Sequence, residues 1–123
     1  MQQGEKLVIA FDFDGTLAGH GYPQIGPIQL DTFGSAIALK KLGCEIVLWT
    51  CRHGELLANA VQWCADRGLE FDAVNTESPG TRKWKKYISR KIYADIYVDD
   101  RGLPPAQLNA IIEYVNKRNS QKK

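Results

Sequence analysis

Two aspartates, Asp12 and Asp14, follow an apolar run early in the chain, within the stretch FDFDGTL at residues 11–17. A second pair, Asp99 and Asp100, ends the later stretch YVDD. Carboxylates that lie close together repel one another unless a cation neutralises them. Oxygen ligands without a histidine or cysteine partner suit Mg²⁺, which also binds phosphate groups. The two pairs therefore predict a magnesium site that handles phosphate, if the fold brings them together.

The spacing of Asp12 and Asp14 suits covalent phosphoryl transfer. An aspartate can attack phosphorus as a nucleophile and form an aspartyl phosphate. A second carboxylate two residues further, past the end of the strand, can protonate the leaving oxygen. Such chemistry depends mostly on positioning and charge stabilisation, so a nearby hydroxyl such as Thr50 and a basic side chain would both contribute.

The segments that would position these residues alternate between strand and helix patterns. Continuous apolar runs predict buried parallel strands, whereas apolar residues at helical spacing, bounded by glycine or proline, predict helices. The order predicts an α/β fold, a Rossmann-like three-layer sandwich with helices on both faces of a central parallel sheet of about four to five strands. The predicted strands are residues 6–12, 44–50, 69–74 and 94–100, and the predicted helices are residues 30–42, 54–67 and 106–118.

The carboxyl ends of parallel strands meet at one edge of a sheet, and ligands bind there. Asp12, Thr50 and Asp99 fall at the ends of three different predicted strands, so we expect them at one edge. Arg52 follows Thr50 by two residues. We expect it at the same edge, as a contact for phosphate or substrate.

Length and composition fit one domain over residues 1–123, with 44% hydrophobic and 24% charged residues. A chain of this length can bury a substantial core. No apolar run reaches the roughly 18 residues of a transmembrane helix, and the first residues lack the pattern of a signal peptide. We therefore expect a cytoplasmic protein without a membrane partner. Three cysteines without CxxC spacing argue against a disulfide framework or a zinc site.

The stretches FDFDGTL, LWTCR and YVDD, with a lysine before the last, resemble the haloacid dehalogenase superfamily. They match its four motifs in order, and the resemblance covers roughly residues 6–101. It implies a phosphomonoester hydrolase in which Asp12 is the nucleophile and Asp14 the general acid and base. Thr50 would bind the transferring phosphoryl group. Members that displace halide lack the second aspartate, so Asp14 favours phosphatase chemistry.

The resemblance also implies the remaining site residues. Lys91 best matches the lysine that neutralises nucleophile and phosphate, with Lys83, Lys85 and Lys86 as competitors. Mg²⁺ would be held by Asp12, by the backbone carbonyl of Asp14, and by Asp100 with Asp99 beside it. Gly15 and Thr16 complete the first motif and are assigned, with Arg52, to substrate binding.

No segment is long enough for the cap domain of most members, so the chain resembles a capless one. An open site needs other cover to exclude water, and capless members act on macromolecules or form oligomers. A homo-oligomer that covers the site is one expectation. The basic stretch RKWKKYISRK, residues 82–91, either grips a phosphate-rich substrate or forms a solvated helix with Trp84 and Tyr87 packed inward.

The leading hypothesis is a Mg²⁺-dependent phosphatase for nucleotides or other phosphorylated metabolites. The alternatives are a polynucleotide-end phosphatase, a receiver-like module that stores a phosphoryl group, and a scaffold without catalysis. In receiver domains the acidic pair precedes the phosphorylated aspartate, and here the order is reversed. The sequence leaves open the physiological substrate, the oligomeric state and whether residues 82–91 bind substrate.

Overall fold

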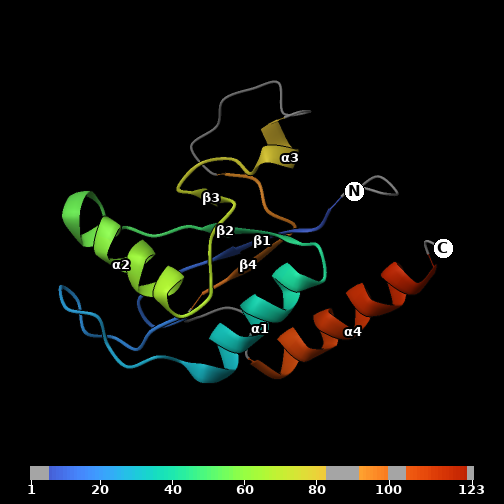
Figure 1. Ribbon diagram of the computed structural model, residues 1–123, viewed down its shortest axis with the longest axis horizontal. Coiled ribbons are helices and arrows are strands. Elements are labelled where there is room, and N and C mark those ends of the chain that lie inside the picture. The colour runs from blue at the N-terminus through green and yellow to red at the C-terminus, as the bar shows by residue number, and fades with distance from the viewer. Residues whose placement is uncertain (1–5, 83–91, 100–104, 122–123) are drawn as a thin grey trace.

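The computed structural model describes residues 6–82, 92–99 and 105–121, which form a parallel sheet with helices packed against it (Figure 1). The strand order is β3-β2-β1-β4, and every pairing is parallel. The predicted α/β Rossmann-like fold is confirmed. The strands are β1 (Val8–Phe11), β2 (Glu45–Leu48), β3 (Ala73–Val74) and β4 (Ile96–Val98), and the helices are α1 (Leu30–Lys41), α2 (Gly54–Asp66), α3 (Pro79–Arg82) and α4 (Pro105–Gln121).

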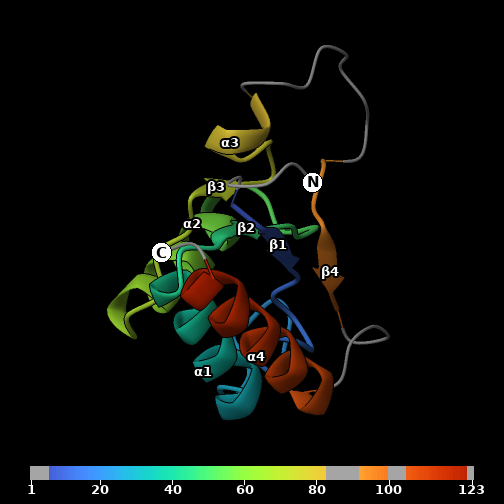
Figure 2. The ribbon, with the colours of Figure 1, turned by 90° about the vertical axis from the view of Figure 1, so that its right-hand side faces the viewer.

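One face of the sheet carries the main hydrophobic core. Alternate strand residues, such as Phe11 and Leu48, point to this face, where they pack with apolar residues of α1, α2 and α4. Helices α1 and α4 lie side by side there (Figure 2). Trp63 of α2 meets the ring of Phe33 of α1 edge to face at 5.8 Å between centroids. The three helices thus form one continuous layer.

The opposite face of the sheet is lined by the other alternate residues, Val8, Ala10 and Val47. Ile92 and Ala94, just before β4, pack against them. The helical layer expected on this face would involve the basic stretch, and residues 83–91 lie outside the described residues. Among the helices of the described part, none is long and apolar enough to span a membrane.

Glycines end the first two helices where the sequence predicts them. Gly43 follows α1 with φ 97° and Gly68 follows α2 with φ 93°. Such left-handed conformations are strained for residues with a Cβ atom and suit glycine at the position after a helix. The turn into β2 and the exit from α2 therefore follow from local sequence.

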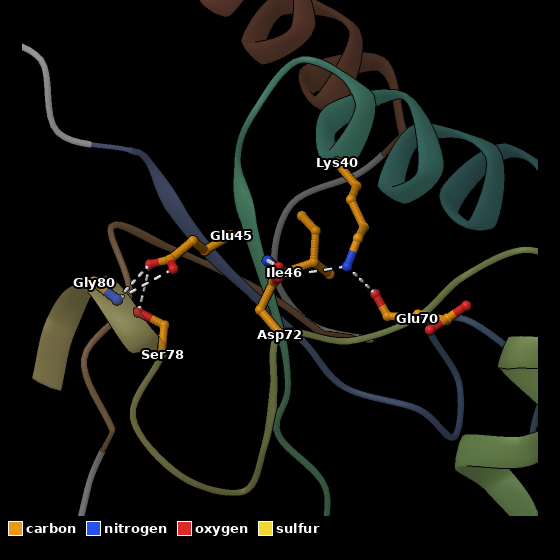
Figure 3. A network of polar contacts seen from close by, with 7 residues as sticks. All are labelled: Lys40, Glu45, Ile46, Glu70, Asp72, Ser78 and Gly80. Carbon is orange, nitrogen blue, oxygen red and sulfur yellow. Dashed lines mark hydrogen bonds and ion pairs between the residues drawn. The ribbon is translucent and has the colours of Figure 1, made fainter.

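Two aspartate side chains, just before the amino ends of β3 and β4, continue the sheet pairing, and Figure 3 shows the first of them, Asp72. Asp72 accepts a hydrogen bond from the Ile46 amide at 2.7 Å, and Asp95 accepts one from Val8 at 2.7 Å. Because the Asp72 carboxylate takes the hydrogen bond of the Ile46 amide, the pairing of β3 with β2 begins only at Ala73. The prediction of a strand over 69–74 is wrong for its first residues, since Leu69 packs into the core from a loop.

A buried carboxylate fixes the start of α3 (Figure 3). Glu45, 7% exposed, accepts hydrogen bonds from Ser78 Oγ at 2.8 Å and from the Gly80 amide at 3.1 Å. Glu45 opens β2, so this contact ties α3 to the amino end of the sheet. The opposite, carboxyl-terminal edge remains for the candidate site.

Candidate active site at the carboxyl edge of the sheet

Asp12 lies between two neighbouring strands at the carboxyl edge. Phe11 pairs with Leu48 on one side and with Val98 on the other. The Asp12 amide donates to Val98 O at 2.9 Å, so the register carries on past the strand ends. Asp99, the residue after Val98, is therefore next to Asp12 across the sheet. The fold brings these two carboxylate residues together, as their positions predict.

The Asp12 side chain is held by its own backbone neighbour. Its Oδ1 accepts a hydrogen bond from the Phe13 amide at 2.7 Å, and the residue is half-buried. A carboxylate with one oxygen fixed in this way has a defined orientation at the end of the central strand. This arrangement suits a group that must meet an incoming phosphorus atom in one geometry.

Thr50 lies two residues beyond the end of β2, and Asn75 fixes its backbone. The side-chain oxygen of Asn75 accepts a hydrogen bond from the Thr50 backbone amide at 2.8 Å. The backbone amide of Asn75 donates to Leu48 O at 2.7 Å. Asn75 has φ 53°, a left-handed conformation that asparagine tolerates better than most residues. Asn75 therefore positions Thr50 through this contact between the turn after β3 and the turn after β2.

Asp14 forms an ion pair with the buried Arg52. Arg52 is 2% exposed, and its Nε and Nη2 donate to the two oxygens of Asp14 at 2.8 and 2.7 Å. The hydrogen bond with Asp14 is the main cause that raises the pKa of Arg52, although burial acts in the opposite direction. The guanidinium predicted to contact phosphate thus lies at the predicted edge, where it binds Asp14.

Arg52 also holds the segment that follows the first motif, which we call the flap (residues 17–29). The base of the flap is paired by hydrogen bonds from Gly19 N to Pro27 O and from Gln29 N to Leu17 O. Near its tip, the carbonyls of Pro23 and Gln24 accept from Nη1 and Nη2 of Arg52 at 3.2 and 2.9 Å.

Two aromatic rings enclose the same guanidinium. The Cζ atom of Arg52 lies 4.9 Å from the ring centroid of Phe13 and 5.1 Å from that of Tyr22, within cation–π range. Tyr22 belongs to the flap and is largely exposed. A groove of about 440 Å³ opens beside the flap and is lined by Pro23, Gln24, Ile25, Arg52, Leu56 and Asn59.

Gly15 and Thr16 form the turn after Asp14. The Phe13 carbonyl accepts from the Thr16 amide at 3.2 Å, and Gly15 has φ 81°, which favours glycine. Thr16 is 5% exposed, and its Oγ1 is a buried oxygen without a hydrogen-bond partner among the described residues. The turn is well defined, and a polar atom beside the site has its hydrogen-bonding capacity unused.

The donor set at this edge fits a hard cation. Asp12 and Asp99 offer carboxylate oxygens without a histidine or cysteine partner, which suits Mg²⁺. The Asp14 carboxylate is bound to Arg52, so the contact implied for Asp14 is the one through its backbone carbonyl. Within the described part of the chain, no group of three or more His, Cys, Asp or Glu side chains could hold a metal. Asp100 and Lys91, the other predicted members, lie outside it.

The cysteines divide into one exposed and two buried thiols. Burial is the main cause that raises the pKa of Cys44 to about 11 and that of Cys64 to about 12. Since the thiolate is the reactive form, both should be inert in the folded protein. We expect a thiol reagent near pH 8 to titrate Cys51 alone in the native state and all three cysteines in denaturant. Rapid native labelling of Cys44 or Cys64 would contradict this burial.

No protein-family model and no curated protein matches the sequence. A solved structure, described as that of a conserved protein coded by a locus of Bacteroides thetaiotaomicron, has the same fold with a TM-score of 0.74. The two sequences are 37% identical, and the match covers 93% of each chain. The chain belongs to the same family as this protein. The match supports the α/β fold over nearly the whole length of the chain, and the description of the Bacteroides thetaiotaomicron protein states no activity.

Proposed function

We propose that the protein is a Mg²⁺-dependent phosphatase that hydrolyses phosphate monoesters through a phospho-Asp12 intermediate. The observation that carries the proposal is the register at the carboxyl edge. It sets Asp12 on the central strand beside Asp99, with Thr50 at the end of the next strand. Asp14 follows in the adjoining turn. We place this activity in the cytoplasm, the compartment expected from the sequence.

In the proposed reaction, an oxygen of Asp12 attacks the substrate phosphorus. The bond from phosphorus to the leaving oxygen breaks, and the electron pair departs with that oxygen, which takes up a proton. The carboxyl group of Asp14 donates that proton to the leaving oxygen, and in the second step Asp14 regains a proton from the attacking water. In the second step water attacks the phosphorus of the acyl phosphate and loses a proton, so that inorganic phosphate leaves and Asp12 is restored.

In this proposal, the other residues of the site bind the phosphoryl group, neutralise its charge or hold the metal ion. Thr50 binds the transferring phosphoryl group, and Lys91 neutralises the nucleophile and the phosphate. Asp12, Asp99, Asp100 and the Asp14 carbonyl would hold Mg²⁺, which supplies neutralisation of the charge on the phosphoryl oxygens when bound. The substrates we propose are nucleotides or other small phosphorylated metabolites, and the alternative is a phosphorylated polynucleotide end.

The proposal is tested by hydrolysis of p-nitrophenyl phosphate, measured with Mg²⁺ and with a chelator. We expect turnover that requires Mg²⁺. A panel of nucleotides and of oligonucleotides phosphorylated at either end then separates the two substrate classes by kcat/KM. A protein that binds beryllium fluoride but turns over no phosphate ester would be a receiver-like module, and one that does neither would be a scaffold.

A further inference from the structure

Arg52 occupies a position that stability alone does not explain. A buried ion pair adds little net stability compared with apolar residues of similar volume, because desolvation of both charges offsets their attraction. Arg52 is nevertheless almost fully enclosed and donates four hydrogen bonds, to Asp14 and to two flap carbonyls. Its partners are the proposed proton-transfer residue, Asp14, and the tip of the flap.

The bond pattern fixes Asp14 in one plane. The planar fork of a guanidinium that meets both oxygens of a carboxylate sets their positions together, a tighter restraint than a single hydrogen bond gives. Asp14 is itself only 19% exposed in its side chain, so little solvent competes for these oxygens. Proton transfer depends on such placement, because a shift of about 1 Å can lower a rate by about a hundredfold.

The same guanidinium fastens the tip of the flap. The base of the flap is held by backbone pairing between residues 17–19 and 27–29. The carbonyls of Pro23 and Gln24 and the ring of Tyr22, all at the tip, bind Arg52 instead. The position of the flap and the orientation of Asp14 are therefore set by one side chain.

We infer that Arg52 is a positioning residue, which orients Asp14 for proton transfer and holds the flap closed beside it. The catalytic part of this inference rests on the proposed phosphatase function. The flap part rests on the contacts alone. Because Pro23 and Gln24 of the flap bind the guanidinium that pairs with Asp14, we expect the fastened flap to limit the access of bulk water to that carboxylate.

The test compares Arg52→Lys with the wild type. Lysine keeps the positive charge but has no planar fork to bridge both Asp14 oxygens and both carbonyls. We expect kcat for p-nitrophenyl phosphate to fall about ten- to a hundredfold with a much smaller change in KM. We also expect amide exchange of residues 20–26, measured by mass spectrometry, to accelerate about tenfold.

Arg67→Lys is the matched control. Arg67 also stacks on an aromatic ring, with Cζ 4.1 Å from the Trp63 centroid, and donates to Trp63 O at 2.9 Å, but it follows the far end of α2. Arg67→Lys should leave both kcat and the amide exchange of residues 20–26 unchanged. If Arg52→Lys does not fold, Tyr22→Leu removes one surface contact to the guanidinium and should still accelerate flap exchange about threefold.

The outcomes separate the inference from the proposed function. An active wild type with kcat and flap exchange unaltered in Arg52→Lys overturns the inference and leaves the phosphatase standing. Equal effects in Arg52→Lys and Arg67→Lys also overturn it, because they would report general loss of stability. A wild type without turnover overturns the phosphatase and with it the catalytic half, while flap exchange still decides the other half.

Discussion

Replacement of Asp12 by asparagine should abolish phosphatase turnover, with kcat lower by about 10³-fold or more. The amide cannot attack phosphorus as a carboxylate does, so the aspartyl phosphate does not form. The fold should persist, because the asparagine oxygen can still accept the Phe13 amide hydrogen bond that Asp12 accepts now. Steady-state hydrolysis of p-nitrophenyl phosphate with Mg²⁺ measures the loss, and thermal unfolding confirms that both proteins are folded.

Asp31→Asn is the control for this variant. Asp31 is an exposed residue in the first turn of α1 with no part in the proposed chemistry, and its change should leave kcat within about twofold. Beryllium fluoride with Mg²⁺ provides a second readout, since a phosphoryl mimic on Asp12 should raise the melting temperature of the wild type and not of Asp12→Asn. Full activity in Asp12→Asn would exclude a phospho-Asp12 mechanism.

Local sequence was sufficient to predict the parallel sheet and part of the site. Asp12 and Asp99 end strands that the apolar runs identify, and parallel strands must bring such ends to one edge. The placement of these residues needs only the alternation of elements and the direction of the strands.

The contacts that orient Asp14 and Thr50 could not be predicted from the strands and their direction. Arg52 meets Asp14 across 38 residues and the flap carbonyls across 28 and 29, so its role depends on how the flap folds back. Asn75 reaches Thr50 across 25 residues from a left-handed turn. The one feature of the sequence that indicates the contact between Asn75 and Thr50 is an asparagine placed just after a short strand. The roles of all the site residues remain predictions, and two of these residues, Lys91 and Asp100, also lie outside the described residues.

Gly26→Ala should open the flap without altering any residue proposed to act in catalysis. A Cβ atom on Gly26 would lie 2.3 Å from the Gly19 carbonyl oxygen and 2.6 Å from its carbon, far inside van der Waals contact. Both neighbours are backbone atoms, so relief requires the two arms of the flap to separate. That movement would strain the Gly19 N to Pro27 O hydrogen bond at the flap base. We expect a loss of about 1–3 kcal/mol in unfolding free energy.

The larger effect of Gly26→Ala should fall on activity. The separated arms would draw the carbonyls of Pro23 and Gln24 away from Arg52, and Asp14 would then lose the rigid partner that orients it. We expect kcat to fall about tenfold or more, with faster amide exchange across residues 20–26. Gly34→Ala is the control, because its Cβ meets nothing within 4 Å on α1 and should raise stability by about 0.5–1 kcal/mol. If Gly26→Ala destabilised the fold but kept full kcat at a temperature where it is folded, flap closure would have no part in the reaction.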